Sequence, residues 1–215
     1  KNISIATGTQ LTAQSIDLLA SGSILGGGNA ADLIAAGPIT LSGDLGIGTS
    51  AASPLSLVVT NPASFVRATT TTGNIFLSSP GKIRLDAVTT GAGNQTVNVQ
   101  AVNGIDLLAS SNFGDSWTLG SSAGSLSFAS GTLITATSFT ADFSGAIAQN
   151  GAATAINTSG ANGPITLTGG SIGSNAQHFV IQPGSGDLAI RARTSDIWLD
   201  VAGGTLHGSD ILNLQ

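Results

Sequence analysis

The densest group of side chains capable of chemistry lies near the C-terminal end of the chain. It contains two arginines, two aspartates, a tryptophan and a histidine: Arg191, Arg193, Asp196, Trp198, Asp200 and His207. If Ile197 and Leu199 face inward on a β-strand, Trp198 and the two carboxylates beside it face outward together. An exposed tryptophan between carboxylates, with arginine nearby, could stack against a sugar and hydrogen-bond it. We favour the simpler interpretation, a charged outer wall whose tryptophan packs on a neighbouring loop, over a ligand site.

Carboxylate pairs are the other possible source of chemistry in this group. Glycosidases need two carboxylates about 5 to 9.5 Å apart. Asp196 and Asp200 are four residues apart on one expected strand and therefore about 13 Å apart. Aspartates from adjacent turns of the chain could still pair, although no pattern requires it. Since the sequence also lacks G-x-S-x-G and P-loop motifs, we expect no catalytic residue and no enzymatic activity.

Metal and cofactor sites have little support in the sequence. The stretch 26–34 weakly resembles the calcium-binding nonapeptide GGxGxDxUx, but Asn29 stands in the fourth place, Asp32 in the seventh, and the stretch does not recur. His178 and His207 have no histidine or carboxylate partner four residues away. The chain has no Cys, which excludes thiolate sites and disulfides. We therefore expect no metal ligand and no cofactor.

The strands that would position these residues are predicted from a repeat in the sequence. Two strand-like apolar bursts recur together at a period of about 20 to 22 residues, which is typical of a solenoid. Stacking one period on the next predicts four apolar columns, each facing the interior. They are Ile75, Val97 and Trp117; Leu77, Val99 and Leu119; Ile83, Ile105 and Leu126; and Leu85, Leu107 and Phe128.

The outward positions support the same register. A slip by one residue would turn Phe76, Asn98 and Thr118 inward, which is much less favourable. In the predicted register Arg84 lies one coil from Asp106, about 5 Å away, where opposite charges attract. Small residues, Gly and Pro occupy the expected corners. The fold class predicted is therefore all-β, a parallel β-helix (β-solenoid) with about ten coils of roughly 20 to 23 residues each.

The period extends toward both ends of the chain with interruptions. It reappears at Ile16 and Ile39, and again at Ile165, Leu188 and Ile211. Around residues 44–66 and 131–160 the register is unclear, and we expect loops or irregular coils there. The only helical candidate, 30–35, is too short to stand alone. We expect one β-solenoid segment over residues 1–215.

Composition excludes several function classes. The net charge is −5, all eleven acidic residues are Asp, and the six basic residues are scattered. Without a basic stripe there is little electrostatic support for nucleic-acid binding. Apolar runs are far shorter than the ~20 residues that span a bilayer, so no membrane insertion is expected. A hydrophobic content of 41% argues against disorder.

A larger repeat leads to a family resemblance. The segments GPITLSGDLGIGTSAASPLSLVV at Gly37 and GPITLTGGSIGSNAQHFVI at Gly163 share their pattern. Together with TTGNIFLSSPGKIRLDAV and VNGIDLLAS, this pattern resembles the repeat shafts of filamentous-haemagglutinin-like large exoproteins, giant secreted adhesins of Gram-negative bacteria. The likeness runs over most of the chain and is strongest between residues 37 and 130. It implies a right-handed parallel β-helix, export by an outer-membrane partner, and roles in adhesion or biofilm. The family's Asn-Pro-Asn-Gly-Ile-type export motif has no match, Asn61-Pro62-Ala63 and Asn103-Gly104-Ile105 being the nearest approaches.

The function expected is that of a stiff shaft or adhesive segment of a secreted, cell-surface bacterial fibre. Lys1 leads directly into an alternating pattern and residues 213–215 end within one, which we interpret as a piece of a longer repeat protein or a filament subunit. Unpaired terminal strands would associate end to end or continue into the same polypeptide. The alternative is a carbohydrate-binding or polysaccharide-cleaving β-helix, with host or cell-surface glycans as partners.

Overall fold

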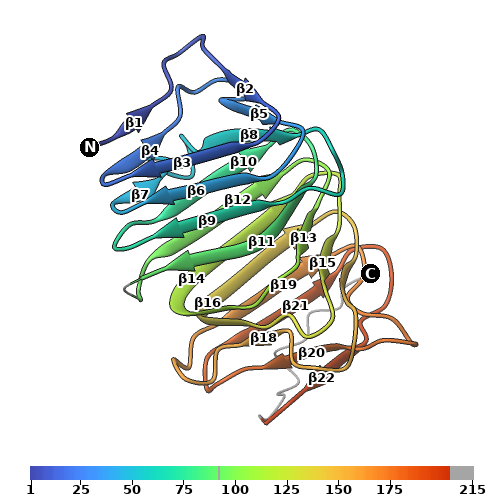
Figure 1. The fold of residues 1–215 in the computed structure, drawn as a ribbon. Coiled ribbons are helices and arrows are strands. Elements are labelled where there is room, and N and C mark those ends of the chain that lie inside the picture. The colour runs from blue at the N-terminus through green and yellow to red at the C-terminus, as the bar shows by residue number, and fades with distance from the viewer. Residues whose placement is uncertain (92, 204–215) are drawn as a thin grey trace.

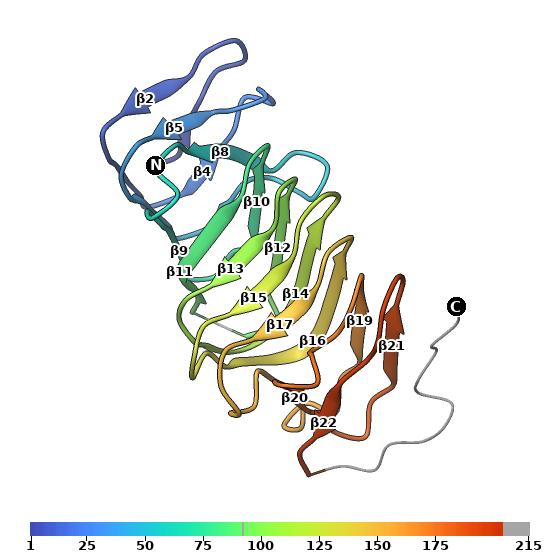
Figure 2. The same cartoon turned by 90° about the vertical axis from the view of Figure 1, so that its right-hand side faces the viewer.

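The computed structural model describes residues 1–91 and 93–203. These residues form an all-β parallel solenoid of about nine turns, with no helix. The coils stack from the N-terminal strands at one end to β22 at the other (Figures 1 and 2). All pairing between named strands is parallel, as expected when each coil hydrogen-bonds to the next.

One wall of the solenoid runs through every coil, and we call it the first wall. Each of its nine strands pairs with the next one in space. They are β1 (Ile3–Ser4), β4 (Ser23–Leu25), β7 (Gly46–Ile47), β10 (Ile75–Ser79), β12 (Thr96–Ala101), β14 (Ser111–Ser121), β16 (Ile134–Phe143), β19 (Ile165–Gly169) and β21 (Leu188–Ala192).

A second wall is the seven-stranded sheet. Its strands are β3 (Ile16–Ala20), β6 (Ile39–Gly43), β9 (Val66–Thr70), β11 (Ile83–Thr90), β13 (Ile105–Leu107), β15 (Leu126–Phe128) and β17 (Ile147–Gln149). Single bridges carry it on from Ile147 to Ile172 and Ile197.

Two shorter runs of strands complete the coils. At the N-terminal end β2 (Leu11–Ala13), β5 (Leu33–Ala35) and β8 (Leu55–Val59) stack on one another. At the other end β18 (Ile156–Asn157), β20 (Phe179–Gln182) and β22 (Leu199–Val201) stack below the first residues of β16.

The four predicted columns are confirmed. Ile75 pairs with Val97 and Val97 with Trp117, and Ile83 pairs with Ile105 and Ile105 with Leu126. All twelve residues of the columns are buried. They belong to one hydrophobic core that runs from Ile16 to Ile190, so each coil hides its apolar side chains against the coils on either side.

The expectation of irregular structure at 131–160 is wrong for half of that range, which is regular strand. β16 covers Ile134–Phe143 and pairs with β14 along most of its length, while β17 and β18 follow. The pattern is hidden because Thr137 and Ser138 are half-buried in succession, which shifts the inward phase from Ala136 to Phe139. In the range 44–66 the outcome is mixed, since β7 and β8 are regular and residues 48–54 leave the wall between them.

Some coils are also longer than the predicted repeat. Ile156 pairs with Ile181 and Ile147 bridges to Ile172, and both steps along the chain exceed the longest one that the sequence pattern predicts. The extra residues lie at corners, where a loop can lengthen without disturbing the stacked strands. The short helical candidate at 30–35 is a strand in its second half, β5.

A buried charge in the Val97 column tests the register. We expect Val97→Asp to lower the free energy of unfolding by about 3–5 kcal/mol, because the carboxylate would be buried without a partner. The matched control is Asn98→Asp, whose half-buried side chain faces outward on the same strand. Urea denaturation followed by circular dichroism measures both; equal midpoints for the two variants would contradict the register.

Candidate functional site

The structure divides the predicted ligand face into two parts. Arg191 and Arg193 lie at and just after the end of β21, on the first wall. Asp196, Trp198 and Asp200 follow the next corner, with Asp200 in β22. The sixth predicted residue, His207, lies outside the described residues.

Trp198 and Asp200 meet a residue that the sequence did not place with them, His178. The His178 and Trp198 rings are 5.6 Å apart between centroids and inclined by 37°. Nδ1 of His178 lies 2.8 Å from Oδ1 of Asp200. Because the His178 side chain is 39% and that of Asp200 59% exposed, the pair is open to solvent. Trp198 itself is half-buried. We call these three residues the histidine–tryptophan cluster.

The register of β20 and β22 brings the cluster together. Phe179 pairs with Leu199, so His178, directly before Phe179, lies next to Trp198 on the adjacent coil. A short excursion, 173–177, lies just before His178 and is closed by hydrogen bonds between Ser174 and Gln177. The sequence signal that could have placed His178 here is the pattern shared by the segments at Gly37 and Gly163.

Those two segments adopt the same local structure. In the first segment, Ile47 pairs with Ile75 and Leu55 pairs with Leu77. Between Ile47 and Leu55 the chain makes an excursion that is closed by pairing of Ser50 with Ser53. In the second, Ile172 bridges to Ile197 and Phe179 pairs with Leu199. The positions of His178, Trp198 and Asp200 therefore correspond to Pro54, Phe76 and Ser78. One backbone motif thus carries Pro54, Phe76 and Ser78 in one copy and a more polar aromatic cluster in the other.

A glycine begins the excursion in both copies. Gly48 has φ +70° and Gly173 has φ +65°, in the left-handed region that favours glycine. A Cβ at Gly173 would overlap the carbonyl oxygen of Trp198 and lie 2.8 Å from the amide nitrogen of Phe179. At Gly48 it would overlap the carbonyl oxygen of Phe76 in the same way. The close approach of backbone to backbone therefore fixes the corner on which the cluster is built.

Arg193 takes part in a different site. Its guanidinium donates to Asp142 Oδ1 at 2.6 Å and to the Phe143 carbonyl oxygen at 2.7 Å. Asp142 of β16 pairs with Thr168 of β19, and Thr168 pairs with Arg191 of β21. The Arg193 side chain therefore extends over the coil of β19 to reach Asp142. The Arg193–Asp142 pair stands at the end of a hollow of about 630 Å³ on the outer surface of the first wall. Hydroxyl and amide side chains of β12, β14, β16 and the residues just after them supply six of its ten lining residues.

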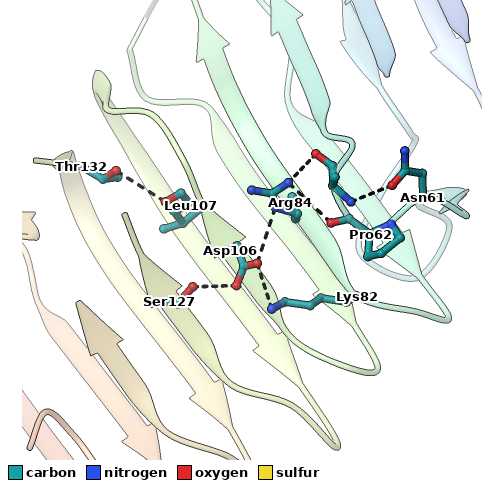
Figure 3. Close-up of polar contacts among 9 residues, drawn as sticks. Asn61, Pro62, Lys82, Arg84, Asp106, Leu107, Ser127 and Thr132 are labelled. Atoms are coloured by element: carbon teal, nitrogen blue, oxygen red, sulfur yellow. Dashed lines mark hydrogen bonds and ion pairs between the residues drawn. The ribbon is translucent and has the colours of Figure 1, made fainter. Parts of the chain in front are cut away.

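A second polar cluster lies on the outer surface of the second wall (Figure 3). Asp106 accepts from Ser127 Oγ at 2.6 Å and lies 2.9 Å from Lys82 Nζ and 3.7 Å from Arg84 Nε. The predicted contact between Arg84 and Asp106 is thus present. Arg84 also donates to the carbonyl oxygens of Pro62 and Ala63 and so holds the loop that follows β8. Asp106 and Arg84 are half-buried and Lys82 is exposed, and pairs near the surface contribute about 0–1 kcal/mol each.

Within residues 1–91 and 93–203, no group of three or more His or Asp side chains is placed to hold a metal ion. Over the same ranges no helix is long and apolar enough to cross a membrane.

No protein-family model, curated protein or solved structure matches the chain. The architecture therefore rests on the pairing and burial described above, and function has to be argued from the surfaces that this architecture presents.

The corner glycine allows a direct test of how the cluster is built. We expect Gly173→Ala to destabilise the protein by about 2–4 kcal/mol, because left-handed strain is added to a backbone overlap. Gly48→Ala should cost a similar amount if the two corners are equivalent. The control is Gly131→Ala, which has φ +75° but open space around its Cβ position and should cost only about 1–2 kcal/mol. Urea unfolding midpoints distinguish them, and a Gly173→Ala loss no larger than that of Gly131→Ala would show that no close approach exists.

Proposed function

We propose that this chain is a rigid shaft segment of a secreted bacterial fibre on the cell surface. The observation that carries the proposal is the first wall, in which nine parallel strands stack above one continuous core. A structure whose coils bond only to their neighbours extends in one dimension, which is what a spacer needs. The resemblance to filamentous-haemagglutinin-like shafts supports the same role, with export through an outer-membrane partner.

The outer surface fits a structural role. Outward positions of the first wall carry small polar side chains on successive coils, as at Thr118, Thr140 and Thr166, which pair in register. Such ladders leave the backbone hydrogen bonds between coils intact and offer a protease no extended segment to bind.

The ends of the stack bear on the partners proposed. In the described part of the chain, β1, β2 and β3 each pair with a strand on one side only. Leu11 and Leu19 are exposed at this end. We propose that this edge pairs with further coils, either of the same polypeptide or of a second subunit. A head-to-tail contact of this kind generates an open filament rather than a closed dimer.

Immunoelectron microscopy on the organism that encodes the chain tests the shaft proposal. Antibodies raised against the folded chain should label fibres on intact cells, because a shaft is exposed along its length. Antibody preadsorbed with the purified chain is the control. Labelling that appears only after the cells are permeabilised would rule out the proposed location.

A second candidate function, carbohydrate binding, is favoured by the histidine–tryptophan cluster. A partly exposed indole beside a carboxylate and an imidazole offers both a stacking surface and polar groups for sugar hydroxyls. At the corresponding corner of the first copy, Phe76 stands between Pro54 and Ser78 and offers fewer polar groups.

That correspondence supplies an internal control for the sugar hypothesis. We expect Trp198→Ala to abolish glycan-array binding while the far-ultraviolet circular dichroism spectrum stays unchanged, because the stacking surface is lost and the fold is kept. Phe76→Ala, at the equivalent corner, should bind like the wild type. An array on which the wild-type chain binds no glycan would remove this candidate and leave the shaft proposal untouched.

A further inference from the structure

A shallow groove crosses several coils on the outer surface of the first wall. The hollow of about 630 Å³ lies over β12, β14 and β16, where register pairing places Gln100, Gly120 and Asp142 in one outward column. Because Gly120 has no side chain, this column lacks a side chain at its middle position. The Gln100 side chain lies across the Cβ position of Gly120. The Gln100 amide therefore covers the Gly120 backbone and forms the floor of the groove.

The groove continues toward the N-terminal coils. A second hollow of about 380 Å³ shares Gln100, Gly120, Ser121 and Ser122 with the first and extends to Ser78 on β10. The shared residues show that the two hollows join. The combined groove therefore runs along the solenoid axis over the wall strands from β10 to β16.

The lining combines hydroxyl and amide side chains with apolar surface, to which Pro80, Ala101 and Val102 contribute in the second hollow. Thr118, Thr140 and Ser144 line the C-terminal hollow, with Gln100 on the neighbouring coil. Such side chains both donate and accept hydrogen bonds, as sugar hydroxyls do. Among the described residues no aromatic side chain lines either hollow, whereas pockets for drug-like ligands are lined mainly by hydrophobic and aromatic side chains. A peptide strand has little to bind there either, because the ladder bonds of the wall already use the backbone groups beneath the groove.

The charges of the groove cancel. Arg193 and Asp142, its two charged lining residues, are bonded to each other at 2.6 Å. The Phe143 carbonyl oxygen holds a second guanidinium nitrogen, so the arginine is fixed in place. A polyanion would meet a neutralised cation within a chain whose net charge is −5. An uncharged ligand meets a fixed donor and a fixed acceptor side by side.

We propose that this groove binds an extended, uncharged polysaccharide along the solenoid axis. Register-paired outward positions recur along the groove at the strand spacing of about 4.8 Å, close to the length of one sugar unit in an extended chain, and two of them, Thr118 and Thr140, carry the same side chain. A regular polymer can thus present one unit to each coil and repeat the same kinds of contact. The site is separate from the histidine–tryptophan cluster and does not depend on the shaft role.

Affinity electrophoresis tests the proposal with soluble neutral polysaccharides in the gel: hydroxyethyl cellulose, mixed-linkage β-glucan, galactomannan and dextran. We expect at least one of them to retard the wild-type chain, and polygalacturonate and heparin to leave its mobility unchanged. Gly120→Gln should raise the dissociation constant roughly tenfold or more, because the added side chain displaces the Gln100 amide and narrows the groove. The matched control is Thr40→Gln, which places the same side chain on the outer surface of the second wall and should bind like the wild type.

A second variant keeps the test valid if Gly120→Gln does not fold. The Asp142→Asn/Arg193→Gln double variant replaces both charged groups by neutral amides and removes the charge-assisted bonds of the pair, so it should also lose affinity. Trp198→Ala should bind normally in this assay. The groove proposal is overturned if no neutral polysaccharide retards the wild type, if only the polyanions do, or if the groove variants bind like the wild type. Loss of binding in Trp198→Ala alone would instead support the histidine–tryptophan cluster.

Discussion

In-register hydrogen bonding between successive coils is the constraint on which the rest of this structure depends. Once Ile75 pairs with Val97 and Val97 with Trp117, every inward side chain must find another inward side chain one coil away. Apolar residues therefore stack in columns and exclude water together. The same register places outward residues above one another, so the groove and the charged cluster around Asp106 are both products of coil-to-coil pairing.

The sequence predicts the fold well where alternation is strict and poorly where it is interrupted. The columns through Ile75 and Ile83 can be placed because each inward position is aliphatic or aromatic and the corners have nearly constant length. In β16 the inward residues include Ala136 and Ala141, and a phase shift lies between them. Alanine carries a weak inward signal in a chain rich in Ser, Thr and Ala, so the sequence of this strand resembles that of an irregular region.

The sites are harder to predict because side chains meet across coils that differ in length. Trp198 and Asp200 were expected to share a face, but His178 joins them only because an excursion precedes it and a shorter corner follows on the next coil. Arg193 is close to Trp198 in sequence, whereas its side chain bonds to Asp142, 51 residues earlier. A contact that a long side chain makes with a distant coil produces no periodic pattern in the sequence.

The spacing between paired residues also governs how such a chain can grow. Strand partners such as Val97 and Trp117, or Ile156 and Ile181, are separated by a single coil of the chain. The loop closed by each new coil therefore stays short however many coils have formed, and the entropy lost per coil does not rise with chain length. Measured against the 215 residues of the chain, these separations give a contact order of roughly 0.1, nearer to that of helical bundles than of β-sandwiches. Folding can therefore advance coil by coil from any coil that has already formed. A polypeptide that emerges gradually in extended form can fold as fast as it emerges.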